Sequence, residues 1–180
     1  MNGLLRSTTR SLLPRSTQAT QAVTEFRGLQ GSNLTSQKQS RTMRRAASSA
    51  SSSIAELERA TFQQINQHRR QNGLAALQRN SVINQQARQH SQAMANSRKL
   101  SHDGFSSRVR VIGNRIAYKS AAENVAFNQG FSNPVAQAVN GWLRSPGHLK
   151  NIVGNYNLTG IGVAKNNQGE FYFTQIFIRQ

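Results

Sequence analysis

The sequence predicts an α+β fold with three layers, in which helices cover both faces of a central sheet. Four segments between residues 53 and 152 have the apolar spacing or the start signals of helices, whereas the end of the chain alternates like strands. The apolar residues of the final strand form two alternating sets: Phe171, Phe173 and Phe177 on one face, and Tyr172, Ile176 and Ile178 on the other. A strand that is apolar on both faces is covered on both faces, so we expect an α-β-α sandwich.

The first two predicted helices cover residues 53–72 and 80–97. Ser53 and Glu56 have the spacing of a capping box at the start of the first helix, and Asn72 with Gly73 supplies its stop signal. Its expected core face repeats at helical spacing: Ile54, Leu57, Thr61 and Ile65. The second helix has one face formed by Ile83, Ala87, His90 and Met94.

Two further helices are predicted before a C-terminal hairpin. The longer one has Pro134 in its first turn and an apolar stripe made by Val135, Ala138, Val139 and Trp142. The shorter one has Ser145 as its N-cap and Pro146 at its first helical position. The chain then forms two strands around a turn at residues 166–169.

The 180-residue chain is strongly basic, with 23 Lys and Arg against 6 Asp and Glu. Residues 1–53 carry eight basic residues against Glu25 alone, and residues 54–180 carry fifteen against five acidic residues. Such an excess attracts nucleic acid, anionic lipid or an acidic cell-wall polymer without choosing among them. The absence of cysteine excludes disulfides, thiolate metal sites and a thiol nucleophile, and no segment is apolar enough to span a membrane.

Residues 1–53 are expected to form a disordered, basic Ser- and Arg-rich tail ahead of one domain at residues 54–180. The tail contains no apolar run of the length that a secretory signal needs. Its Arg-rich, Ser-rich and acid-poor composition is that of an organelle transit peptide. The alternatives are a basic tail without a targeting role and a misassigned start codon.

Four histidines are candidates for chemistry. We interpret His90 as a packed core histidine and His68 as a surface residue. His102 and His148 follow helix boundaries, where a turn can direct a side chain into a cleft. If Ser145 caps the short helix, His148 lies in its first turn, where the helix dipole favours a neutral imidazole that can act as a metal ligand or a base. The alternative for both is a structural turn histidine.

Glu123 is one of only six acidic residues, and it stands among small and apolar neighbours in "SAAENVAF". Two imidazoles and this carboxylate could form a two-histidine, one-carboxylate site with open coordination positions. His102, Glu123 and His148 are 21 and 25 positions apart along the chain. This spacing alone does not show that they meet.

Seven segments carry a resemblance to a known family. In chain order they are "INQHRRQNGLAAL", "ARQHSQAMA", "SHDGF", "AENVAF", "GWLRSPGHLKNI", "TGIGVAK" and "YFTQIF". This ordered run, between Thr61 and Gln180, resembles the CAP superfamily of cysteine-rich secretory proteins, antigen 5 and plant pathogenesis-related proteins, whose domain is also called the SCP domain. The "SPGH" form and the absence of cysteine are similar to the compact bacterial branch, and to its cyanobacterial members in particular.

The resemblance implies an α-β-α sandwich with a central cleft lined by two histidines and two acids, and some members bind a divalent metal through the histidines. By position the histidines are His102 and His148, and the first acid is Glu123, which would face the cleft and orient the imidazoles. The second acid corresponds to Ser145, whose hydroxyl cannot serve as the general base that a carboxylate would be. We therefore expect zinc or another divalent metal on His102 and His148, and no organic cofactor.

The favoured function is a non-enzymatic binding module that holds a metal ion, with a lipid, a sterol or a protein partner as a further ligand. The first alternative is a metal-dependent hydrolase that uses His102, Glu123 and His148, the candidates for catalysis. The second is a basic protein that binds nucleic acid or an anionic cell-wall or membrane surface. Nucleic acid is disfavoured because the aromatic residues at 171–177 lie in a strand expected to be buried. The resemblance favours an extracellular or cell-envelope location, in contrast to the transit-like N-terminus.

Overall fold

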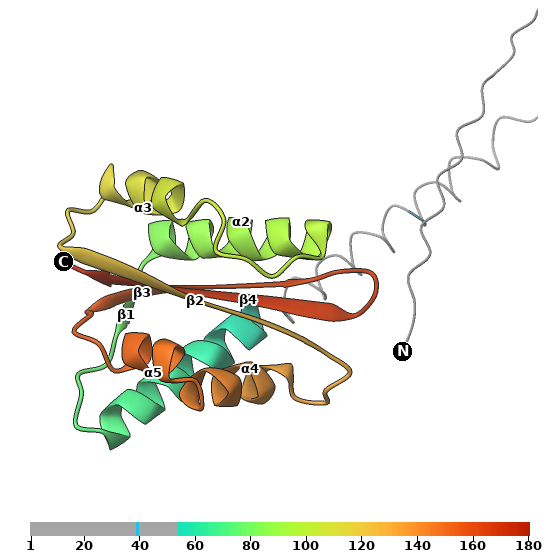
Figure 1. Cartoon of the computed structure of the whole chain (residues 1–180), viewed down its shortest axis with the longest axis horizontal. Coiled ribbons are helices and arrows are strands. Elements are labelled where there is room, and N and C mark those ends of the chain that lie inside the picture. Colours follow the sequence, from blue (N-terminus) through green and yellow to red (C-terminus); the bar gives the residue numbers. More distant parts are fainter. Residues whose placement is uncertain (1–38, 40–53) are drawn as a thin grey trace, which may run out of the picture. The chain divides into compact units, whose positions relative to one another are not determined.

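The computed structural model describes residue 39 and residues 54–180, and the latter form a four-stranded sheet between two layers of helices (Figure 1). The strands are β1 (Gln78–Arg79), β2 (Ser120–Gln129), β3 (Leu158–Lys165) and β4 (Glu170–Arg179), in the order β1-β3-β4-β2. β1 runs parallel to β3, and the other neighbours are antiparallel. The predicted sandwich is confirmed. The tail predicted at residues 1–53, including Ser53, lies outside the described residues except for residue 39.

Strand β4 is central to the fold because both of its faces are buried. Phe173 and Phe177 belong to the core under one helical layer, whereas Ile176 and Ile178 belong to the core under the other. Tyr172 packs on the same side as these isoleucines, against residues of α2. The two alternating sets expected from the sequence are therefore confirmed, and so is the hairpin, since β3 and β4 enclose the predicted turn.

One layer contains the helix over residues 54–71, which has no label in Figure 1, together with α4 (Pro134–Leu143) and α5 (Pro146–Ile152). The first helix stops where expected, with Gly73 at a φ of 72°. α4 buries the predicted stripe of Val135, Ala138, Val139 and Trp142. Nε1 of Trp142 donates to the carbonyl of Val125 at 2.9 Å, and this bond ties α4 to β2.

The other layer contains α2 (Ser81–Ser97) and α3 (Phe105–Gly113). Asn80 caps α2 because its side-chain oxygen accepts hydrogen bonds from N–H groups of the first turn. α2 lies directly on β3, where Gly160 and Gly162 have no side chain: a Cβ at either position would overlap the α2 backbone at Ile83 or Ala87. Within the described residues, neither layer contains a helix long and apolar enough to cross a membrane.

Three elements are absent from the sequence-based prediction: β1, β2 and α3. β2 is an edge strand, and its alternation is obscured by three polar residues that the fold buries: Glu123, Asn124 and Asn128. Each of them hydrogen-bonds to a residue of α3, α4 or α5, which offsets the cost of burying Glu123 and Asn124 and part of that of Asn128, whose Oδ1 is buried without a partner among the described residues. The strand therefore depends on long-range contacts that a local pattern does not contain.

Ser145 corrects one detail of the prediction. It occupies the N-cap position of α5 with extended backbone angles, φ −102° and ψ 117°, but its side chain accepts no hydrogen bond from a helix N–H. The hydroxyl lies instead 2.8 Å from Nδ1 of His148. The predicted capping bond is wrong because an imidazole three residues further on competes for the same hydroxyl.

Candidate functional site

Glu123 is a buried carboxylate at the β2 edge of the sheet, and an arginine neutralises it. The side chain is only 1% exposed. Arg108 of α3 donates from Nε to Oε2 at 3.0 Å and from Nη2 to Oε1 at 2.8 Å. A bidentate pair of this kind offsets the loss of hydration of the carboxylate. The lone acid in its apolar stretch therefore has a charged partner that the chain supplies from another element.

His102, in the loop between α2 and α3, is the second partner of Glu123. Its Nδ1 lies 2.9 Å from Oε1, and its side chain is 55% exposed. A carboxylate paired with a guanidinium is an acceptor, so Nδ1 of His102 donates, and in the neutral tautomer of such a ring the lone pair is on Nε2. Nη1 of Arg108 also donates to the carbonyl of Asp103 at 2.7 Å. One guanidinium thus holds both the carboxylate and the loop that carries His102.

His148 is held from the opposite face of β2. Its main-chain carbonyl accepts a hydrogen bond from Nδ2 of Asn124 at 3.1 Å, and Asn151 donates to the Asn124 oxygen at 2.9 Å. Glu123 and Asn124 are neighbours in the strand, so their side chains point to opposite faces of the sheet. β2 therefore brings one histidine from each face of the sheet to the same edge.

The electrostatic environment favours a neutral ring at His148. Burial lowers the pKa of His148, and the nearby charge of His102 lowers it further. The two imidazoles are thus close enough for one to affect the ionisation of the other. When Nδ1 of His148 donates to the Ser145 hydroxyl, Nε2 carries the lone pair, as it does in His102. Both rings can then offer Nε2 to a ligand.

His90 is the packed histidine that the sequence predicts, yet it contacts the same network. It is 6% exposed, its Nε2 donates to the carbonyl of Ser101 at 2.7 Å, and it lies 4.0 Å from Oε1 of Glu123. Burial lowers the pKa of His90, and the bond to Ser101 acts in the opposite direction. His90 therefore supports the residue that precedes His102. His68 is half-buried at the end of the first helix and contacts Asn72.

Arg108 and His90 are the residues of the site that sequence reasoning misses. Arg108 lies on the buried face of α3 with Val109 and Ile112. A basic residue within an apolar stripe is the signal that identifies it, because a buried arginine needs a partner. His90 gives the same signal on α2, where packing alone explains its position.

The histidine pair, defined as His102 and His148, consists of two imidazoles, which are ligands of the kind that a divalent cation such as zinc takes. The two-histidine, one-carboxylate set considered from the sequence is not formed, since the described residues contain no group of three His, Cys, Asp or Glu side chains that could hold a metal ion. Glu123 lies behind His102, on Nδ1, which is the place of an outer carboxylate that orients a metal-binding imidazole. Metal ligation by the histidine pair stays a prediction.

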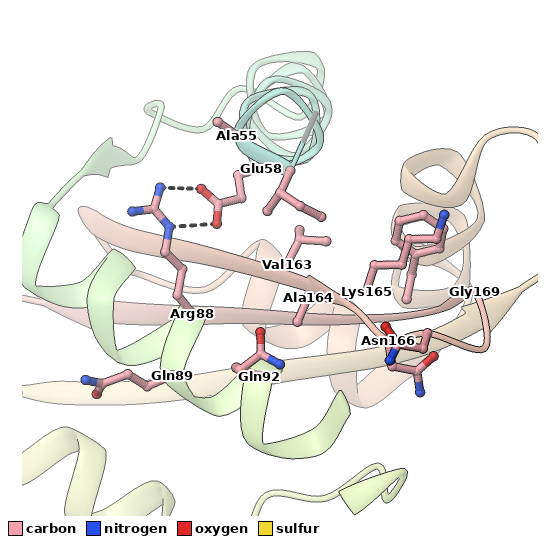
Figure 2. A pocket seen from close by; sticks show the side chains of 13 residues that line it. Ala55, Glu58, Arg88, Gln89, Gln92, Val163, Ala164, Lys165, Asn166 and Gly169 are labelled. Atoms are coloured by element: carbon pink, nitrogen blue, oxygen red, sulfur yellow. Dashed lines mark hydrogen bonds and ion pairs between the residues drawn. The ribbon is translucent and has the colours of Figure 1, made fainter. Parts of the chain in front are cut away.

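A groove of about 1020 Å³ lies beside β3 (Figure 2). In the sheet, β4 separates β3 from β2, the strand that the residues of the predicted site contact. The groove runs between the start of the helix over residues 54–71 and α2. Glu58 of the former and Arg88 of the latter form an ion pair within it. Its lining includes none of His102, Glu123 and His148, so this cavity is separate from the predicted site.

The chain is similar to proteins of one family. The model of the cysteine-rich secretory protein (CAP) family matches residues 62–177. The Bacillus subtilis protein YkwD is 35% identical over 133 residues, which cover 72% of this chain and 50% of YkwD. The chain thus spans about half the length of this curated relative.

Solved structures agree with the fold. An outer surface protein from Borrelia burgdorferi has a TM-score of 0.61 at 18% identity, with 69% of this chain and 93% of that chain covered. At this identity the likeness shows the fold alone. An extracellular protein containing an SCP domain from Bacillus anthracis has a TM-score of 0.57 at 29% identity, with 71% and 43% covered. Bacterial relatives are thus present, as the resemblance implies.

Proposed function

Because the chain belongs to the cysteine-rich secretory protein (CAP) family, we propose that it is a non-enzymatic binding module whose histidine pair holds a divalent metal ion, zinc or a similar cation. The observation that supports this most is that both imidazoles are held through Nδ1, His102 by Glu123 at 2.9 Å and His148 by Ser145 at 2.8 Å. Each ring therefore keeps Nε2 for a ligand. An oriented imidazole binds a metal better than a mobile one, because less freedom is lost on binding.

The contacts of Glu123 favour binding over hydrolysis. A metal-dependent hydrolase that uses His102, Glu123 and His148 needs a carboxylate free to take a proton from a metal-bound water. Glu123 is 1% exposed and already accepts hydrogen bonds from Arg108 and His102. Ser145, at the position of the second family acid, is a hydroxyl. The hydrolase is therefore the second choice.

The location and any further ligand are proposals by analogy. One structure similar to this chain, at 29% identity, is named as an extracellular protein, which supports a place outside the cell or in its envelope for this chain as well. The positive charge of residues 54–180 would favour an anionic cell-wall or membrane surface there over a neutral one. A lipid or sterol ligand has no residues assigned to it. Nucleic acid is the last choice: Phe173 and Phe177 are fully buried and cannot stack on bases, although Phe127 and Phe131 are exposed.

Zinc titration of the full chain by calorimetry tests the proposal. We expect one zinc ion per chain, and we expect His102→Ala and His148→Ala each to abolish binding. His68→Ala is the matched control. His68 is half-buried on a different helix, and within residues 54–180 its side chain hydrogen-bonds to Asn72 alone. Binding should also weaken as the pH falls through the imidazole range, because protons compete for Nε2.

Two results would count against the proposal. Zinc binding that persists in His148→Ala would remove that residue from the site. Cleavage of a peptide or ester substrate by the wild type, dependent on zinc and lost in His102→Ala, would replace the binding module by the hydrolase.

A further inference from the structure

Among residues 54–180, the histidine pair has no free carboxylate beside it that could balance the charge of a bound cation. Glu123 accepts two hydrogen bonds from Arg108 and one from His102, and the Glu123–Arg108 pair is neutral as a unit. Asp103 follows His102 in the chain, but its side chain is 76% exposed and pairs with Lys99 at 3.1 Å. The charge of each of these acids is therefore already compensated.

The two histidines differ in the group that holds Nδ1. His102 has a carboxylate there, whereas His148 has the hydroxyl of Ser145, which carries no charge. A divalent cation on the two Nε2 atoms would thus bring two positive charges into a part of the chain with fifteen basic and five acidic residues. Such a site favours a negatively charged ligand over water in its open positions.

We propose that the histidine pair binds its cation together with an oxyanion, a carboxylate or phosphate group of the ligand, and that Ser145 is the residue that creates this requirement. The inference rests on the proposed function and adds the chemical class of the ligand. Two imidazoles leave at least two positions of a tetrahedral cation for other donors, and oxygen donors are suitable for zinc. The oxyanion supplies the negative charge that a glutamate at position 145 would supply from the protein.

Cobalt(II) serves as the probe, because its visible absorption changes when its ligands change. The full chain is loaded with cobalt in nitrate buffer at constant ionic strength and titrated with acetate, with methyl phosphate and with neutral acetamide. We expect acetate, methyl phosphate or both to shift the absorption and to raise the cobalt affinity about tenfold, the scale on which the surroundings of a metal ligand act. Acetamide should change neither.

Variants at position 145 assign the effect. Ser145→Glu should bind cobalt more tightly without added anion, and the enhancement by anions should fall about tenfold, again on the scale of outer contacts to a metal ligand. Ser145→Ala should keep the enhancement, because it is still uncharged. Ser81→Glu is the control for added charge, since Ser81 is exposed in the first turn of α2 and outside the histidine network. Ser145→Asp replaces Ser145→Glu if circular dichroism shows that the latter is unfolded.

The outcomes separate this inference from the proposed function. Wild type that binds no cobalt overturns both. Cobalt binding that responds to neither anion overturns the oxyanion ligand alone, and so does an anion response in Ser145→Glu equal to that of the wild type. A response to acetate alone supports a carboxylate ligand, and a response to methyl phosphate alone supports a phosphate ligand.

Discussion

Glu58 and Glu123 are buried carboxylates that the fold neutralises in the same way. Glu58 lies near β3 and Glu123 on β2, with β4 between these two strands. Glu58 accepts hydrogen bonds from Nε and Nη2 of Arg88, and Glu123 accepts them from the same two atoms of Arg108. The Glu58–Arg88 pair joins the helix over residues 54–71 to α2 (Figure 2). Of the two carboxylates, Glu123 alone contacts a histidine within the described residues. A buried Glu–Arg pair is thus a structural tie, and the attached imidazole distinguishes the candidate site.

The two pairs also differ in how deeply the arginine is buried. The side chain of Arg88 is 53% exposed, whereas that of Arg108 is 10% exposed. Arg88 can therefore turn to solvent if its partner is lost, and Arg108 cannot. The comparison leads to separate expectations for the two carboxylates in stability, in metal affinity and in pH dependence.

The largest expected effect is on stability. Glu123→Gln should lower the free energy of unfolding by about 3 kcal/mol, because it leaves Arg108 charged, buried and without its partner. Glu58→Gln should cost about 1–2 kcal/mol, because Arg88 regains water. Urea unfolding followed by circular dichroism measures both. Equal losses, or a larger loss for Glu58→Gln, would contradict the difference in burial as the cause.

The second expected effect is on zinc affinity, which should change for Glu123→Gln but not for Glu58→Gln. The change in binding free energy should be smaller than the loss of stability. Glu123→Gln should weaken zinc binding by about 10–100-fold, because an amide orients His102 less well than a carboxylate. Glu58→Gln should leave the affinity unchanged, because Glu58 contacts neither histidine. Calorimetry at a temperature where both variants are folded makes the measurement. A matching loss in Glu58→Gln would show that the effect reports general destabilisation.

The smallest expected effect is a pH dependence confined to the Glu123 side. Burial lowers the pKa of His90 and His148 from 6.5. The unfolded chain then binds more protons than the folded chain below about pH 6.5, so stability is fully present above that pH and is lost as the pH falls. His148→Gln should reduce this slope, and Glu58→Gln should retain it. Urea unfolding with a chelator present, at several pH values, checks this, and a slope unchanged by His148→Gln would exclude that residue.

Strand β4 and the helices other than α3 were accessible to sequence reasoning because their patterns are local. The two alternating apolar sets of β4 and the apolar stripe of α4 indicate which faces are buried, and the structure buries those faces. Strand β2 lacks such a pattern, since Glu123 and Asn124 are polar and become buried through partners on α3 and α5. Those partners lie 15 and 24 residues away, beyond any local window.

The candidate site was predictable only through family resemblance. The spacing of His102, Glu123 and His148 contains no motif, and the approach of each histidine to β2 depends on adjacent residues of that strand that face opposite layers. Arg108 belongs to no quoted segment of the resemblance, although it neutralises Glu123. Ser145 was expected as a cap from its position alone, and the position is right. The direction of its hydroxyl is decided by His148, which a capping rule does not consider.

Gly160 and Gly162 of β3 determine how closely α2 approaches the sheet. α2 rests on Gly160 and Gly162 without an intervening side chain, and the chain passes from the end of α2 into the loop with His102. Protein interiors are close-packed, so a methyl group added at either glycine would move α2 as a unit. The position of the loop that carries His102 is therefore fixed partly by Gly160 and Gly162, which lie on another strand. In this chain the distance between α2 and β3 therefore helps to determine where His102 lies at the β2 edge of the sheet.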